Sequence, residues 1–191
     1  MLSPSLGFIM RKNGLVITAV MGLLSVSVFG QSQRPEFSNG PVIENYGPVV
    51  DVRADYSLKK DVLYRAVMDV SRSPDDDSAL NRSIESAARY LNMHARAGVP
   101  LSNMKLAIVL HGSASKDALS SPAYEARYGK ANPNDDLLNQ LHNAGVEIYI
   151  CGQSAGFAGF QNTELHESVM MATSAMTVLT RLQAEDWSLL P

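Results

Sequence analysis

The chain has 191 residues, a formal net charge of −3 and a single cysteine, Cys151. A chain of this length buries enough surface for one good core and not for two, so we expect a single domain. A mildly acidic surface argues against a nucleic-acid or anionic-lipid partner. One cysteine excludes an intramolecular disulfide, so packing must stabilise the fold.

The first thirty residues have the pattern of a secretory signal peptide. Arg11 and Lys12 precede an uncharged apolar stretch over residues 14–29, which is short for a membrane-spanning helix and ends in small residues. We predict a signal peptide over residues 1–30, cleaved after Gly30, and a periplasmic or secreted mature protein with no membrane association. An uncleaved membrane anchor is the alternative. Met10 is an alternative translation start to Met1.

The mature chain is predicted to begin with a segment that lacks regular structure. Residues 31–48 are rich in Gly, Pro, Asn and Ser, which is typical of an extended arm that is either draped over the domain or loose. The domain itself is predicted over residues 49–191. Its first element is expected to be a short edge strand over residues 49–52.

The first strand and the first long helix are predicted from different periodicities. Residues 62–70 alternate well enough for a strand. Residues 75–78, three aspartates and a serine, then start a stretch with apolar residues three and four apart, which predicts an amphipathic helix with acids at its N-terminus. Gly98 and Pro100 are expected to end it.

The central part of the chain is predicted to contain a strand, a loop and a helix. Residues 105–110 form a continuous apolar run, as expected of a strand buried on both faces of a parallel sheet. After His111 we expect a polar loop as far as Tyr128. The helix that follows is capped by residues 132–133 and ended by Gly145.

The next strand is predicted over residues 146–150 and delivers Cys151 at its carboxyl end, directly before a glycine-rich turn. The remaining expected elements are a helical turn at Thr163, a strand within residues 169–177 and a final helix over residues 178–185. Strands that alternate with helices indicate βαβ units. The predicted fold is therefore α/β, with a mostly parallel sheet and helices on both faces.

Two polar residues lie at the carboxyl ends of successive predicted strands. His111 ends one predicted strand and Cys151 ends the next, and ligands gather outside the carboxyl ends of parallel strands. If the two strands are neighbours, imidazole and thiol lie on one rim. Backbone amides of the following turn would lower the thiol pKa and so increase the reactive thiolate.

Each of these residues also has a structural interpretation. Cys151 can be a small buried hydrophobe, and the His111 ring can order its loop through a hydrogen bond to a carbonyl. Gly152, Gln153 and Ser154 are candidate substrate-binding residues, because their donors can reach an anionic sulfur. For Gln153 and Ser154 the alternative is that they satisfy the turn itself.

Other kinds of site are disfavoured by spacing. Residues 152–156 match the G-x-S-x-G motif of serine hydrolases, but only His166 follows the serine, without the acid that the order of such triads requires. The four histidines show no metal-ligand spacing, so no metal site is predicted. The chain lacks both common glycine-rich phosphate motifs, so no cofactor is expected.

Several segments together resemble the DsrE/DsrF-like, or YchN-like, family. They are the strand ending in His111-Gly112, the run from Ala144 to Ala155, and Ser174-Ala175-Met176-Thr177 ahead of a helix. The similarity runs from about Leu63 to the C-terminus and is most specific around Cys151. It implies a small flavodoxin-like domain of about five strands that commonly assembles into trimers or hexamers. The sulfur-relay members of the family hold sulfur as a persulfide on a cysteine that corresponds by position to Cys151.

Two hypotheses of function follow. In the first, the protein is an exported sulfur carrier in which Cys151 is the nucleophile, His111 favours the thiolate, and a donor or acceptor protein is the partner. In the second, it is a non-enzymatic oligomeric module that binds a small ligand and has a structural cysteine. Burial of Cys151 would favour the second, and an exposed sulfur within reach of His111 would favour the first.

Overall fold

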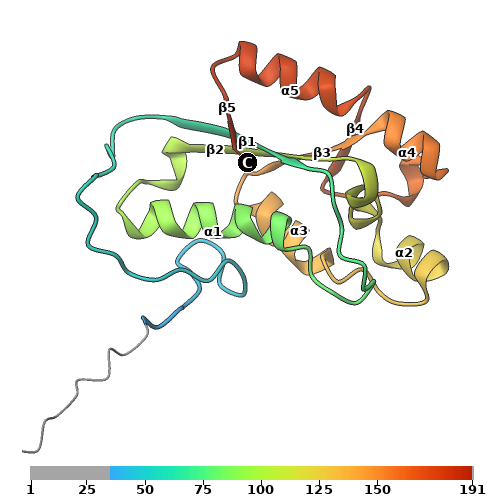
Figure 1. Cartoon of the computed structure of the whole chain (residues 1–191), viewed down its shortest axis with the longest axis horizontal. Helices are drawn as coiled ribbons and strands as arrows, with labels where there is room; N and C mark the ends of the chain where they lie inside the picture. The colour runs from blue at the N-terminus through green and yellow to red at the C-terminus, as the bar shows by residue number, and fades with distance from the viewer. Residues whose placement is uncertain (1–34, 191) are drawn as a thin grey trace, which may run out of the picture. The chain divides into compact units, whose positions relative to one another are not determined.

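A single parallel sheet of five strands organises the part of the chain that the computed structural model describes, residues 35–190. The strand order is β4-β3-β2-β1-β5, and every neighbouring pair is parallel (Figure 1). The strands are β1 (Tyr64–Val70), β2 (Met104–Leu110), β3 (Glu147–Cys151), β4 (Val169–Ala172) and β5 (Ser188–Leu190). The predicted α/β fold is thereby confirmed.

Helices cover both faces of the sheet, and unequally. Helices α1 (Arg82–Arg96) and α3 (Asp135–Asn143) contribute to the larger apolar core on one face, whereas α5 (Ala175–Ala184) crosses all five strands on the other (Figure 1). Side chains alternate between the faces along each strand. Thus Leu106 and Ile108 of β2 lie in the α1 core, whereas Val109 packs with α5.

The shorter helices lie in the connections. They are the 3₁₀ helices over Leu101–Asn103, Gly112–Ala118 and Asn162–Glu164, and the α-helices α2 (Ser121–Tyr128) and α4 (Gly152–Ala158). None of the helices within residues 35–190 combines the length and the apolar character that crossing a bilayer requires.

Several predicted elements were wrong in their bounds or kind. The loop expected as far as Tyr128 contains α2, and the expected turn after Cys151 is the helix α4. Residues 49–52 form no strand beyond one isolated bridge between Ser38 and Val49. The strand expected within residues 169–177 ends at Ala172, because Ser174 accepts a hydrogen bond from the Thr177 amide and caps α5.

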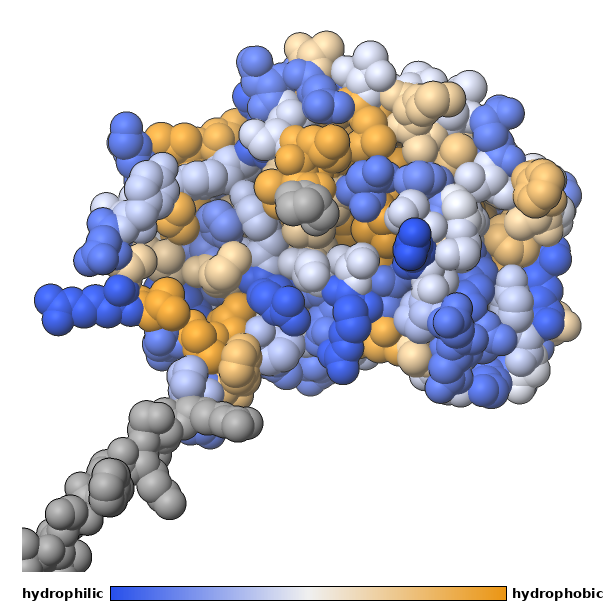
Figure 2. Space-filling view, viewed as in Figure 1, coloured by the Kyte–Doolittle hydropathy of each residue, from blue (hydrophilic) through white to orange (hydrophobic). Residues whose placement is uncertain are grey.

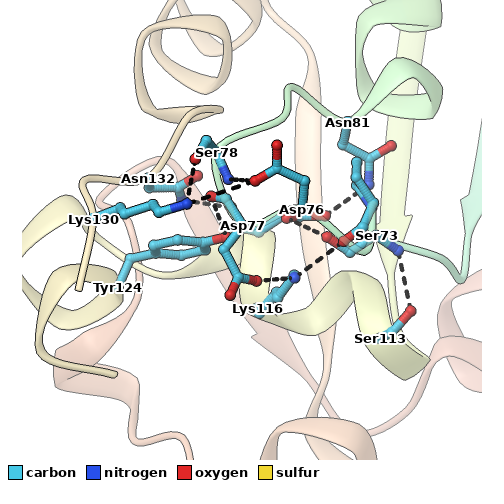
Figure 3. Close-up of polar contacts among 12 residues, drawn as sticks. Ser73, Asp76, Asp77, Ser78, Asn81, Ser113, Lys116, Tyr124, Lys130 and Asn132 are labelled. Atoms are coloured by element: carbon cyan, nitrogen blue, oxygen red, sulfur yellow. Dashed lines mark hydrogen bonds and ion pairs between the residues drawn. The ribbon is translucent and has the colours of Figure 1, made fainter. Parts of the chain in front are cut away.

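The start of α1 also differs from the prediction. The helix begins after Asn81, whose side-chain oxygen accepts hydrogen bonds from the amides of Ser83 and Ile84, and not at the acidic run over residues 75–78. That run belongs to a loop held by polar contacts, among them those of Lys116 with Asp77 and of Lys130 with Ser78 (Figure 3). An N-cap satisfies free amides directly, so it decides the helix boundary more strongly than charge does.

The segment that precedes β1, residues 38–49, packs on α1. Asn92, fully buried on α1, accepts hydrogen bonds from the amides of Val42 and Ile43 and donates to the carbonyls of Ile43, Tyr46 and Gly47. Ile43 is 1% exposed and lies in the larger core. The segment is thus part of the packed structure. The predicted signal peptide, residues 1–30, lies outside the described residues.

Candidate functional site

The ends of β2 and β3 bring the two predicted reactive residues to the same rim of the sheet. The strands are direct neighbours, and their register pairs Leu110 with Ile150. His111 directly follows Leu110, and Cys151 directly follows Ile150. Both continue the alternation onto the α5 side, because they follow residues whose side chains lie in the α1 core.

Cys151 is the last residue of β3 and the N-cap residue of α4, and it is 6% exposed. Burial acts to raise the pKa of its thiol, but donors facing the sulfur outweigh that effect and lower the pKa below its ordinary value. These donors are the backbone amides of Ser154, Ala175 and Gln153 and the Ser154 hydroxyl. The Cys151 side chain makes no capping hydrogen bond to α4. The N–H and O–H groups therefore act on the sulfur as oriented dipoles, which favour the thiolate.

Ser154 connects this sulfur to the end of β2. Its hydroxyl oxygen accepts a hydrogen bond from the Gly112 amide at 3.1 Å, and the same hydroxyl is among the groups that lower the pKa of Cys151. No histidine in residues 35–190 hydrogen-bonds Ser154. His166, the only histidine after it in the chain, instead contacts Ser168 and Asp135. The serine of the G-x-S-x-G motif therefore lacks the base that a hydrolase needs.

Glycines allow the close backbone approaches around Cys151. A β-carbon on Gly152 would lie 2.6 Å from the Ala172 carbonyl oxygen, and one on Gly112 would lie 2.7 Å from the Ser71 carbonyl oxygen. Gly112 also has a φ of +57°, which disfavours other residues. Gln153 is exposed, and its side-chain amide donates to the Thr173 carbonyl at 3.2 Å. The predicted substrate-binding residues thus join the ends of β2, β3 and β4.

The His111 ring pairs with a residue that the sequence analysis did not single out. Its Nε2 lies 2.6 Å from Oδ1 of Asp69, in β1, and both side chains are partly exposed. No hydrogen bond joins His111 to Cys151 within the described part of the chain. The sequence did hold a signal for Asp69, which is an acidic residue one position before the end of a predicted strand. Ligand-binding and catalytic residues lie at that edge of a parallel sheet.

The Ala175 amide was also missed. Ala175 lies in the range 169–177, within which a strand was predicted, whereas it starts α5 and contributes to the environment of the Cys151 sulfur. The amino ends of two helices, α4 and α5, therefore lie beside this sulfur. Among residues 35–190, no cluster of three or more His, Cys, Asp or Glu side chains has the arrangement of a metal site.

Comparison with solved structures shows the fold. Protein MTH1491 of Methanobacterium thermoautotrophicum, described as of unknown function, aligns with a TM-score of 0.51 at 19% sequence identity and covers 66% of this chain and 97% of its own. The ychN protein of E. coli aligns with a TM-score of 0.48 at 18% identity over 67% of this chain and 98% of its own. At such low identity the first alignment supports the architecture alone.

Sequence comparison gives the family. No curated protein matches the chain. Residues 65–191 match the sequence profile described as the DsrE/DsrF-like family, which spans the whole sheet from β1 and includes the ends of β2 and β3. More than half of the chain lies within this match, as the segments around His111 and Cys151 predict. The chain belongs to the DsrE/DsrF-like family.

Proposed function

We propose that this protein carries sulfane sulfur, with Cys151 as the nucleophile that accepts a sulfur atom as a persulfide and passes it on. The observation that carries the proposal is the set of donors facing the Cys151 sulfur, which lower its pKa against the opposing effect of burial. A cysteine that only filled space would not need such an environment, because a neutral thiol is a weak hydrogen-bonding group. Membership of the DsrE/DsrF-like family supports the same chemistry.

The reaction is a simple displacement. The thiolate attacks the outer sulfur of a persulfide R–S–SH, the new S–S bond forms as the old one breaks, and R–S⁻ leaves with the electron pair. No external oxidant is needed, because the sulfane sulfur moves between two thiols. A largely buried sulfur also limits over-oxidation, which follows thiolate character and exposure.

Intact mass spectrometry of the purified mature chain, with and without polysulfide, tests this proposal. The native protein is expected to gain about 32 Da for each sulfur atom bound, removable by a thiol reductant. Cys151→Ser is expected to gain nothing. Equal gains by both proteins, or no gain by the native chain, would contradict sulfur carriage by Cys151.

The burial of Cys151 favours a second candidate, an oligomeric module that binds a small ligand and keeps a structural cysteine. At 6% exposure the sulfur is not openly accessible in the single chain. This candidate predicts that a thiol probe labels Cys151 only after unfolding. Labelling of the folded protein at a rate comparable to that of a free thiol would remove it.

The proposal includes export and a protein partner. The predicted signal peptide supports a periplasmic or secreted protein, and a donor or acceptor protein with an accessible thiol would be its partner in persulfide exchange. Phe157 on α4 is 98% exposed and Met176 on α5 is 76% exposed, and each belongs to a helix that begins beside Cys151. Apolar side chains of this kind support docking of another protein near the sulfur.

We also propose that the chain forms a homo-oligomer, a trimer or a hexamer. The α5 face of the sheet is only partly covered, and a groove of about 450 Å³ between α5, β3 and β4 is lined by Tyr149, Met170 and Trp187, among others. Met170 and Leu189 remain 49% and 47% exposed. Figure 2 shows further apolar surface below α5, on the side of the molecule that carries the C-terminus. Burial of such surface is the usual driving force for association.

Light scattering during gel filtration measures the assembly. The native chain is expected to elute with the mass of three or six chains, and Met170→Glu with a lower mass because it places a charge in the proposed contact. Gln183→Glu, on the exposed side of α5, is the matched control and should not change the mass. A single-chain mass for the native protein at micromolar concentration would contradict the assembly.

A further inference from the structure

Asp69 and His111 form a close pair on the same rim of the sheet as the proposed nucleophile. The His111 Nε2 atom lies 2.6 Å from Asp69 Oδ1. A carboxylate can only accept a hydrogen bond, so this contact places the proton of a neutral imidazole on Nε2. Nδ1 is then the nitrogen with a free lone pair, and it makes no hydrogen bond to any residue within 35–190.

The sheet places the pair and the sulfur on one face, in strand order. Asp69 lies one residue before the end of β1, His111 follows the end of β2, and Cys151 ends β3. The order β1, β2, β3 puts His111 on the middle strand, and adjacent strands lie about 4.8 Å apart. Asp69 is paired with Val109, which packs against α5, so its side chain shares that face.

Other charged groups on this face lie away from the pair. Arg65, Lys105 and Glu147 occupy the starts of β1, β2 and β3. On α5, Arg181 binds Glu185 near the end of the helix that is distant from Cys151. Asp69 is therefore the carboxylate that pairs with His111 among the described residues of this face.

We propose that Asp69 is a positioning residue for the sulfur chemistry of Cys151: it holds His111 in the tautomer whose Nδ1 takes up the thiol proton and returns it to the leaving group. The inference rests on the proposed sulfur carriage and adds a route for the proton. His111 Nδ1 accepts the Cys151 proton, the thiolate attacks the outer sulfur of R–S–SH, and R–S⁻ leaves and takes the proton from His111. The balance is one thiol and one persulfide on each side.

Two reagents separate this inference from the proposed function. Cysteine persulfide transfers sulfur and releases a thiolate that needs a proton. Methyl methanethiosulfonate modifies the thiolate and releases a sulfinate that needs none, so it reports formation of the thiolate alone. Both rates are measured from pH 5 to 9 by intact mass for the native protein, Asp69→Asn, His111→Ala and the double variant. Asp61→Asn and His142→Ala change exposed residues elsewhere and serve as matched controls.

Asp69→Asn is expected to slow sulfur transfer about 10-fold or more, and His111→Ala about 100-fold. The double variant is expected to be no slower than His111→Ala, because Asp69 acts through His111. Modification by the thiosulfonate should slow less than sulfur transfer, and the controls should match the native protein.

The outcomes are distinguishable. If the native protein carries sulfur but Asp69→Asn has native rates and a native pH profile, the positioning role is wrong and the proposed function stands. If the native protein gains no sulfur but reacts with the thiosulfonate, and Asp69→Asn slows that reaction, the proposed function fails and Asp69 still controls the thiol. If Cys151 reacts with neither reagent in the folded protein, both are wrong.

Discussion

Asn92→Leu is expected to lower the free energy of unfolding by about 3–5 kcal/mol, because it removes several buried hydrogen bonds whose backbone partners cost about 1–3 kcal/mol each when left unpaired. The Asn92 side chain satisfies two amides and three carbonyls of the segment before β1. Leucine keeps a similar volume, so the change isolates the polar contacts. Urea unfolding of both proteins measures the difference.

The same variant should release the segment before it unfolds the sheet. Arg96 also binds this segment, through the carbonyls of Ser38, Asn39 and Gly40, and it remains in Asn92→Leu. Hydrogen exchange at the Val42 and Ile43 amides is therefore expected to accelerate more than exchange within β2. Asn143→Leu, at an exposed position of α3, is the control and should unfold like the native protein. Unchanged exchange at Val42 would show that Asn92 does not hold the segment.

Asp117→Leu is expected to destabilise the domain by a comparable amount, about 3–5 kcal/mol, because two buried amide donors and one half-buried hydroxyl lose their acceptor. Asp117 is 1% exposed and accepts hydrogen bonds from Ser73, Asn81 and Asn134. These residues join the loop after β1, the start of α1 and the start of α3, next to the contacts drawn in Figure 3. Loss of the carboxylate should loosen all three, as measured by thermal or urea unfolding.

The pH dependence identifies the carboxylate specifically. Burial raises the pKa of Asp117 above its ordinary value, more than its hydrogen bonds and Lys116 lower it. The folded state therefore binds the proton more tightly than the unfolded state. The stability that protonation of Asp117 contributes is fully present below about pH 4, and it is lost as the pH rises through the raised pKa of Asp117.

Comparison with Asp117→Asn, which cannot ionise, isolates this effect. The stability of the native protein relative to the variant should fall as the pH rises above about 4 and then become constant. Asp75→Asn, at an exposed position of the loop after β1, is the matched control for removal of a carboxylate. A constant difference between native and Asp117→Asn from pH 3 to 8 would contradict a raised pKa.

The sequence was most informative where burial and periodicity agree. The strands β1, β2 and β3 each carry enough apolar residues in a regular pattern to be predicted within a few residues, and the apolar spacing of α1 predicted the helix but not its start. Cys151 was placed at the end of a strand for the same reason, because Ile148 and Ile150 bury one face of β3. Parallel packing of those strands then follows from the helices between them.

Prediction failed where local pattern and tertiary contact compete. The strand β5 has three residues and pairs only with β1, so nothing in its sequence distinguishes it from a tail. The helix α4 contains two glycines, which locally favour a turn, and its first residue Gly152 lies against the Ala172 carbonyl. Only the packing of β4 beside β3 determines that arrangement.

The sequence by itself determined the α/β order, the family resemblance and the position of the one thiol at the end of a strand, because these depend on residue type and spacing along the chain. The tertiary structure decided which groups surround that thiol. The Ala175 amide comes from a segment 24 residues away from Cys151 in the chain, and the Asp69 carboxylate, 82 residues away, pairs with His111 on the same rim of the sheet. Such contacts depend on strand order and register, which no local pattern of residues specifies.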